Sequence, residues 1–165
     1  MTRVLVALAL VAAPVAALAA GSEHGGRAVE DSGAEHAGRG MDGSGGMSML
    51  RHRYVMRNGL PDRYRSRKNP LDATAENLAA GERVYESRCV SCHGVSGRGD
   101  GPAAGSLEPG PTDIARFSRT PMASDGYLFW TVAEGGAPVG SAMPAFGDAL
   151  SEAEIWQLLL YLRRM

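Results

Sequence analysis

Two closely spaced cysteines followed by a histidine constrain the fold of this chain more than any other feature of its sequence. Residues 89–93 read CVSCH, and Cys89 and Cys92 are the only cysteines among 165 residues. Because they are three positions apart, a disulfide between them cannot join distant parts of a domain. A small fold held together by a disulfide framework is therefore excluded.

The spacing C-x-x-C-H is the attachment sequence of c-type haem. Two thiols must add to vinyl groups at one edge of the same ring, and residues i and i+3 of a helical turn point to the same side. His93 follows directly and is in position to become an axial ligand of the iron. We therefore expect one covalently bound haem c, with Cys89 and Cys92 as its thioether residues and His93 as its proximal iron ligand.

Three other uses of a cysteine pair fit the rest of the sequence less well. A thioredoxin-like redox pair belongs in a βαβ pattern, which does not surround these cysteines. A zinc site needs a second ligand pair at suitable spacing, and the sequence has none. A structural disulfide would leave the long Gly/Pro-rich stretch over residues 94–121 without a purpose.

The N-terminus has the pattern of a secretory signal peptide. Arg3 precedes an apolar run over residues 4–13, and residues 17–19 read ALA, a small-x-small cleavage pattern. We expect a signal peptide at residues 1–19 and a mature chain in the periplasm that does not span a membrane. An uncleaved anchor is the alternative, but the apolar run is at the short limit for a span and Pro14 interrupts it.

Composition divides the remaining chain into three segments. Residues 20–49 are rich in Gly, Ser and His and are expected to be a disordered tail. Residues 50–69 carry seven Lys and Arg residues and form a basic strap. Four roles are open for it: a surface extension, a docking element for an acidic partner, a segment pinned to its own domain, or a segment that adheres to anionic lipid. Residues 70–165 form the compact domain. The net charge of −1 gives no reason to expect a nucleic-acid partner.

Three helices are predicted in this domain from residues that cap helix N-termini. No stretch alternates between apolar and polar residues as a strand does. The Gly/Pro-rich stretch over residues 94–121 is typical of a loop that wraps around something. The domain is therefore expected to be all-α, with a prosthetic group at its centre. The capping residues and their helices are Thr74 for 76–88, Ser124 with Asp125 for 126–134, and Ser151 with Glu154 for a C-terminal helix.

A methionine is the expected sixth ligand of the iron. Three methionines follow His93, namely Met122, Met143 and Met165. Met143 is favoured as the distal ligand because it lies in a loop before the last helix, where Pro144 fixes the neighbouring backbone. With both axial positions filled, electron transfer remains and small-molecule chemistry at the iron is suppressed.

The segment from Ala80 to the C-terminus resembles a class I c-type cytochrome, similar to the cytochrome c domains of cbb3-type oxidase haem subunits. The resemblance implies the cytochrome c fold, with three to four helices around one haem. It implies that the first and last helices cross, with Gly81 and Tyr85 meeting Trp156 or Tyr161. The stretches that carry it are 80–85, 89–94, 97–102, 143–146 and 156–162.

The resemblance also implies that a proline carbonyl accepts the second ring N–H of His93. Pro111 is the expected proline and Pro102 is the alternative. Such a bond fixes the orientation of the imidazole ring.

We expect a periplasmic electron carrier that is not an enzyme, with redox proteins as donor and acceptor. Three alternatives remain open: a haem subunit of a dehydrogenase or oxidase complex, an enzyme with an open distal side, or a copper-linked cytochrome. The last rests on methionine and histidine residues, which suit copper. They are His24, His36, Met41, Met47, Met49, His52 and Met56.

Overall fold

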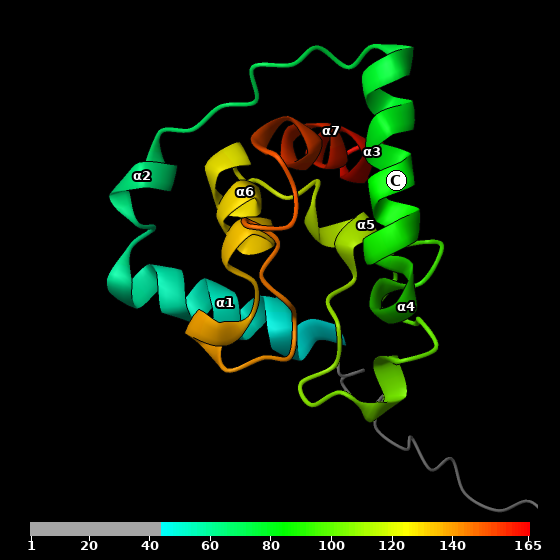
Figure 1. Cartoon of the computed structure of the whole chain (residues 1–165). Coiled ribbons are helices and arrows are strands. Elements are labelled where there is room, and N and C mark those ends of the chain that lie inside the picture. Colours follow the sequence, from blue (N-terminus) through cyan, green and yellow to red (C-terminus); the bar gives the residue numbers. More distant parts are fainter. Residues whose placement is uncertain (1–43) are drawn as a thin grey trace, which may run out of the picture. The chain divides into compact units, whose positions relative to one another are not determined.

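The computed structural model describes residues 44–165, and all regular structure in this range is helical (Figure 1). This confirms the expected all-α fold. No helix in this range is both long and apolar enough to cross a bilayer. The expected signal peptide and the tail up to residue 43 lie outside the described residues. The helices are α1 (Ser44–Asn58), α2 (Asp62–Arg65), α3 (Ala75–Arg88), α4 (Val90–His93), η1 (Ala104–Ser106), α5 (Ile114–Phe117), α6 (Asp125–Glu134), η2 (Ala137–Val139) and α7 (Glu152–Leu162).

The three helices predicted from capping residues are α3, α6 and α7. The Thr74 hydroxyl accepts the N–H of Asn77 at 3.2 Å and starts α3. The Ser124 hydroxyl starts α6 in the same way. Ser151 and Glu154 form a complete capping box at the start of α7. Each cap satisfies an N–H group that the first helical turn leaves without a partner.

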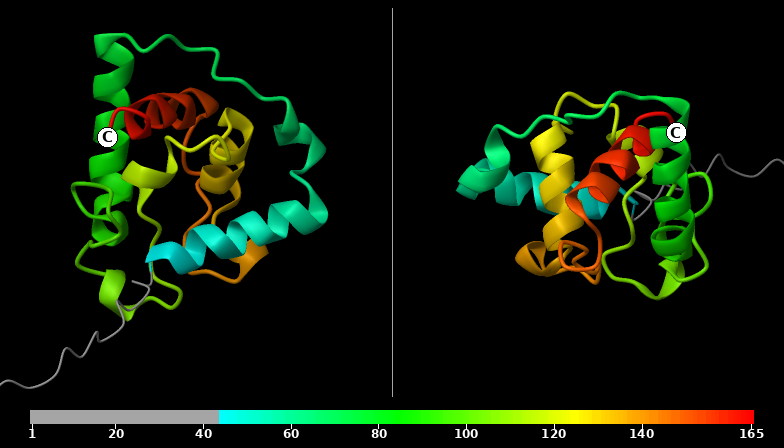
Figure 2. Two further views of the ribbon diagram at one scale, coloured as in Figure 1. Left: turned by 180° about the vertical axis from the view of Figure 1, so that it is seen from behind. Right: turned by 45° about the horizontal axis from the view of Figure 1, so that its top comes forward.

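Helices α3 and α7 cross at very short range, as Figures 1 and 2 show. A Cβ atom on Gly81 of α3 would lie 2.1 Å from the Gln157 carbonyl oxygen of α7. One helical turn further along α3, the Tyr85 ring packs on Tyr161, with 5.5 Å between the ring centroids. The expected crossing of the first and last helices of the domain is confirmed, with Tyr161 as the partner of Tyr85.

Aromatic and aliphatic side chains of α6 and α7 form most of the core. Phe129 of α6 and Trp156 of α7 pack with ring centroids 4.5 Å apart. Full burial of a large apolar side chain stabilises a fold by about 1.5–3 kcal/mol. The buried large side chains of these two helices are Tyr127, Leu128, Phe129, Trp130, Val132, Ile155, Trp156, Leu158, Leu159 and Leu162.

The basic segment contains a helix that the sequence analysis missed. Helix α1 begins at Ser44, inside the segment expected to be a disordered tail, and it runs through the start of the strap. It packs beside η2 (Figure 2). Arg51 is buried, and Tyr54 stacks on Trp130 with 5.7 Å between the ring centroids. Burial of this one face, and not helix propensity alone, accounts for a helix in so Gly-rich a segment.

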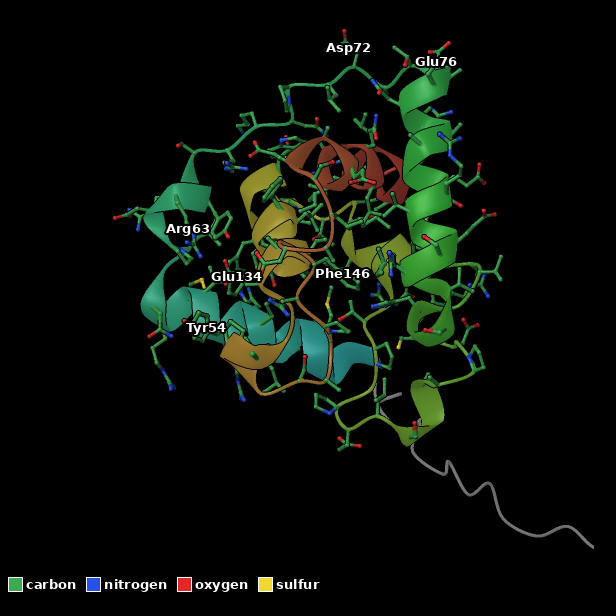
Figure 3. The ribbon with its side chains drawn as sticks, in the orientation of Figure 1. Tyr54, Arg63, Asp72, Glu76, Glu134 and Phe146 are labelled. Carbon is green, nitrogen blue, oxygen red and sulfur yellow. The ribbon has the colours of Figure 1, made fainter. Side chains whose placement is uncertain are left out.

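Basic side chains fasten the following residues to the acidic domain. Arg63 donates to the Glu134 carboxylate (Figure 3), and the Tyr64 hydroxyl donates to the same carboxylate. Arg67 pairs with Glu152 at 3.0 Å, and its guanidinium lies over the Phe129 ring at 4.5 Å. Of the roles left open for the basic strap, these contacts favour a segment pinned to its own domain.

A carboxylate at the start of α6 holds two distant parts of the chain. Asp125 accepts the backbone N–H of Asn69 at 3.0 Å and pairs with Arg163 at 2.7 Å. Burial by itself raises the pKa of Asp125, but the hydrogen bonds from Asn69 and Arg163 outweigh it, and the pKa lies below its ordinary value. The ionised form is therefore favoured by folding.

Replacement of Asp125 by asparagine is expected to lower the free energy of unfolding of the haem-loaded chain by ~1–3 kcal/mol at pH 7. Because the folded pKa is depressed, this contribution is complete above the unfolded pKa of about 3.9 and is lost as the pH falls below it. Denaturant titrations at pH 7 and at pH 3 measure the difference, which should shrink at pH 3. Asp148→Asn, at an exposed carboxylate, is the control. Equal stability of Asp125→Asn and the unaltered chain at pH 7 would contradict the prediction.

Candidate functional site

One cavity brings together the residues that the sequence analysis assigned to one site. Cys89, Cys92, His93, Pro111 and Met143 all line it, although they come from three separate parts of the chain. The rest of its wall is largely apolar and includes Leu107, Ile114, Phe117, Leu128, Val132, Phe146, Leu158 and Leu162.

The cysteines lie on one tight turn between α3 and the loop that follows. Cys89 ends α3 and also precedes α4, and its carbonyl accepts the N–H of His93 at 2.8 Å. Gly94 ends this turn with a φ of 75°. Both cysteines are half-buried and line the same cavity. The helical turn therefore presents two thiols and an imidazole to one space.

The Cys89 thiol is a weaker acid than the nucleophile of a thiol–disulfide centre. Burial, and then the neighbouring Cys92, raise the pKa of Cys89 to about 11. Redox-active C-x-x-C pairs have a thiol whose pKa is lowered, because the thiolate is the nucleophile. The folded chain thus disfavours the thioredoxin-like alternative and agrees with cysteines that serve as attachment points.

The His93 ring is held by a backbone carbonyl, but not by the one that was expected. Its Nδ1 atom lies 3.0 Å from the Thr112 carbonyl oxygen. A carbonyl only accepts, so Nδ1 donates and Nε2 keeps the lone pair that a metal needs. The expectation of Pro111 as acceptor is wrong by one residue. The Pro111 carbonyl packs against Gly99 instead, 2.4 Å from where a Cβ atom of that residue would lie. The alternative, Pro102, is exposed.

Burial also favours the uncharged imidazole. It lowers the pKa of His93, and the hydrogen bond to Thr112 opposes this shift only in part. Neutral imidazole is the form that binds a metal ion. The ring therefore has the tautomer and the uncharged state that a metal ligand needs.

A pair of glycines holds the loop that carries Met143. The Gly136 N–H donates to the Met143 carbonyl at 2.8 Å. Gly135 has a φ of 63°, and a Cβ atom there would lie 2.5 Å from the backbone of Pro144 and Ala145. The loop therefore packs closely against the turn that ends α6, and Met143 forms part of the cavity wall.

The other two methionines after His93 lie elsewhere. Met122 is 46% exposed. The Met165 side chain lies next to Gly97 and lines a separate surface hollow, not this cavity. The arrangement agrees with the preference for Met143, whose role as a ligand stays a prediction.

Three polar cavity residues were missed by the sequence analysis. Arg51, Tyr127 and Thr131 line the cavity, and each has a buried polar atom without a hydrogen-bond partner in residues 49–165. The spacing of Arg51, Tyr54 and Val55 at i, i+3 and i+4 was the available signal for a buried face on α1. Thiols, imidazole, thioether, apolar walls and unpaired polar groups together fit a haem, which has an iron, an apolar ring and two carboxylates.

Comparison with known proteins identifies the family. A family model described as cytochrome c oxidase, cbb3-type, subunit III matches residues 76–162. The chain belongs to this family of c-type cytochromes. The cytochrome therefore carries covalently bound haem c and takes part in haem-based electron transfer. Helices α1 and α2 precede the matched residues.

A solved structure supports the same assignment. The cytochrome is 33% identical to a chain of the reducing HAO-like protein complex of Kuenenia stuttgartiensis, with a TM-score of 0.50. The match covers 58% of the cytochrome and 46% of that chain, so the cytochrome spans less than half of its length. No curated protein matches the cytochrome.

Proposed function

We propose that this protein is a periplasmic carrier of single electrons between redox proteins. Its haem c is attached to Cys89 and Cys92, with His93 and Met143 as axial ligands. The observation that carries the proposal is the meeting of these four side chains at one largely apolar cavity. The periplasmic location is supported by the signal-peptide pattern at residues 1–19 and by membership of a c-type cytochrome family.

In this function the residues of the chain hold the two axial side chains in place and shield the site from water. Bound haem supplies a reversible one-electron change between ferric and ferrous iron. The Thr112 carbonyl orients the His93 ring through Nδ1, and the Gly135-Gly136 turn fixes the Met143 loop. The apolar wall excludes water from the centre of the site. A rigid site of this kind changes little between two oxidation states, as electron transfer requires.

Absorption spectra of the mature protein test the proposal. The protein is produced in cells with haem-c maturation machinery and examined in ferric and ferrous forms, with and without carbon monoxide. We expect a low-spin c-type spectrum, a weak far-red band from methionine ligation of ferric iron, and no response to carbon monoxide. Rapid carbon monoxide binding to a high-spin ferrous form would favour an enzyme or sensor with an open iron.

Replacement of Met143 by alanine is expected to open the sixth position of the iron. The far-red band should disappear, ferrous protein should bind carbon monoxide, and the reduction potential should fall, because thioether ligation raises it. Met122→Ala is the matched control, since it removes an exposed methionine thioether. If the far-red band and the reduction potential are unchanged in Met143→Ala but the band disappears and the potential falls in Met122→Ala, the ligand assignment moves to Met122.

A second candidate function is that of an electron-transfer subunit within a larger complex. The similar chain of Kuenenia stuttgartiensis belongs to a named protein complex, and this favours the candidate. Affinity purification of the tagged chain from its native periplasm separates the two functions. A stoichiometric partner retained at high salt supports a subunit, and a monomer in size-exclusion chromatography supports a free carrier.

A further inference from the structure

Arg51 is buried beside the haem cavity without an acidic partner. It belongs to α1, before the residues that match the family, and only 4% of it is exposed. Its Nη2 donates to the Gly135 carbonyl at 2.8 Å, and its guanidinium carbon lies 4.9 Å from the centre of the Trp130 ring. Its Nη1 is buried, and no residue in the described part of the chain accepts a hydrogen bond from it. A buried cation with an unused donor is unfavourable unless something else pairs with it.

No ion pair within residues 49–165 neutralises this charge. Glu134 is next to the carbonyl that Arg51 contacts, but its carboxylate accepts from Arg63 and from the Tyr64 hydroxyl. Guanidinium stays protonated in proteins even when burial opposes the charge. The counter-charge is therefore expected from the molecule that occupies the cavity.

Two hydroxyl groups of α6 extend this polar end of the cavity. The Tyr127 hydroxyl and the Thr131 Oγ1 are buried and also lack a partner among the described residues. They are four positions apart and so lie on the same face of the helix. Both residues line the cavity together with Arg51. One cation and two hydroxyl donors in an otherwise apolar wall are the groups that bind a carboxylate.

We propose that Arg51, with Tyr127 and Thr131, binds a propionate carboxylate of the haem and thereby raises the reduction potential. Haem brings two such carboxylates, and no other substituent at the edge of the ring is anionic. Reduction adds one electron to the site, so a cation that stays nearby favours the ferrous form. Arg51 acts on the iron through the propionate and is thus a positioning residue, contributed from outside the family domain. The inference rests on the haem binding of the proposed function.

The test compares four haem-loaded full chains: unaltered, Arg51→Lys, Arg51→Met and Arg53→Met. Arg53 lies two residues away on α1 and is exposed, so its replacement removes the same charge without touching the cavity. Potentiometric titration gives each reduction potential. Infrared difference spectra between ferric and ferrous forms, with the propionate carboxyl carbons labelled with ¹³C, report the carboxylates directly.

We expect Arg51→Met to lower the reduction potential and to shift a labelled carboxylate band. Arg51→Lys should keep the charge but lose the planar pair of donors of the guanidinium. The reduction potential and the carboxylate band should therefore shift less than in Arg51→Met. Arg53→Met should match the unaltered chain. Unaltered carboxylate bands in Arg51→Met would overturn the inference, whether or not the potential moves, because a purely structural role would not touch the propionate. If Arg51→Met does not retain haem, Arg51→Lys decides, and unshifted bands there overturn the inference.

The absorption spectra separate this inference from the proposed function. An unaltered chain without covalently held haem would overturn both. A normal c-type spectrum in all four chains, with the same carboxylate bands throughout, would overturn the role of Arg51 alone.

Discussion

Replacement of Cys89 and Cys92 together by alanine is expected to abolish covalent attachment of haem. The two thiols are the only ones in the chain, so no other residue can form a thioether with the vinyl groups. Haem content after acid–acetone extraction, and haem staining on a denaturing gel, measure the loss. We expect staining to fall to background in the double variant and to persist in the unaltered chain.

Ser91→Ala is the matched control for this experiment. Ser91 lies between the two cysteines on the same turn and is exposed, so its replacement tests the turn without removing a thiol. It should retain all of its covalent haem. Haem that survives extraction in the double cysteine variant would exclude the proposed attachment site.

Replacement of Gly81 by alanine is expected to destabilise the folded cytochrome by roughly 2–3 kcal/mol. Alanine is the better helix former by about 1 kcal/mol, so propensity alone predicts the opposite result. The packing outweighs it, because the new Cβ would lie 2.1 Å from the Gln157 carbonyl oxygen. Because the atoms that the new Cβ would meet belong to the backbone of α7, a side-chain rotation cannot relieve the clash, and α3 and α7 must move apart. Denaturant unfolding followed by circular dichroism measures the change.

Gly105→Ala is the matched glycine control. Gly105 lies in η1, and a Cβ atom there would have no neighbour within 4 Å. Its replacement should leave the free energy of unfolding within about 0.5 kcal/mol of the unaltered value, as for most surface substitutions. If Gly81→Ala is as stable as Gly105→Ala, the close helix crossing is not required for stability.

Local chemistry explains how much of this fold could be predicted from the sequence. The caps at Thr74, Ser124 and Ser151 depend on residues within one turn of the helix that they start, and each was predicted correctly. The CVSCH turn is equally local. These features need no information about distant parts of the chain.

The errors concern contacts between distant segments. The acceptor for His93 lies 19 residues away, and a change of one residue in loop path decides between Pro111 and Thr112. Helix α1 forms because Arg51 and Tyr54 meet α6 and its following turn, about 80 residues later. Its Gly-rich start has low helix propensity, so composition indicated a tail. Met143, favoured because of its proline neighbour, lines the same cavity as His93, and its role as a ligand stays a prediction.

The turn after α6 serves two parts of the chain at once. The Gly135 carbonyl accepts the hydrogen bond from Arg51, and the Gly136 N–H donates to Met143. A fragment cut to the family-matched residues 76–162 would lose the first bond and uncover the Trp130 ring on which Tyr54 stacks. Contacts that cover the core therefore extend beyond the boundary drawn by family resemblance. A fragment that keeps these contacts, for expression or for transplantation into another protein, begins at α1.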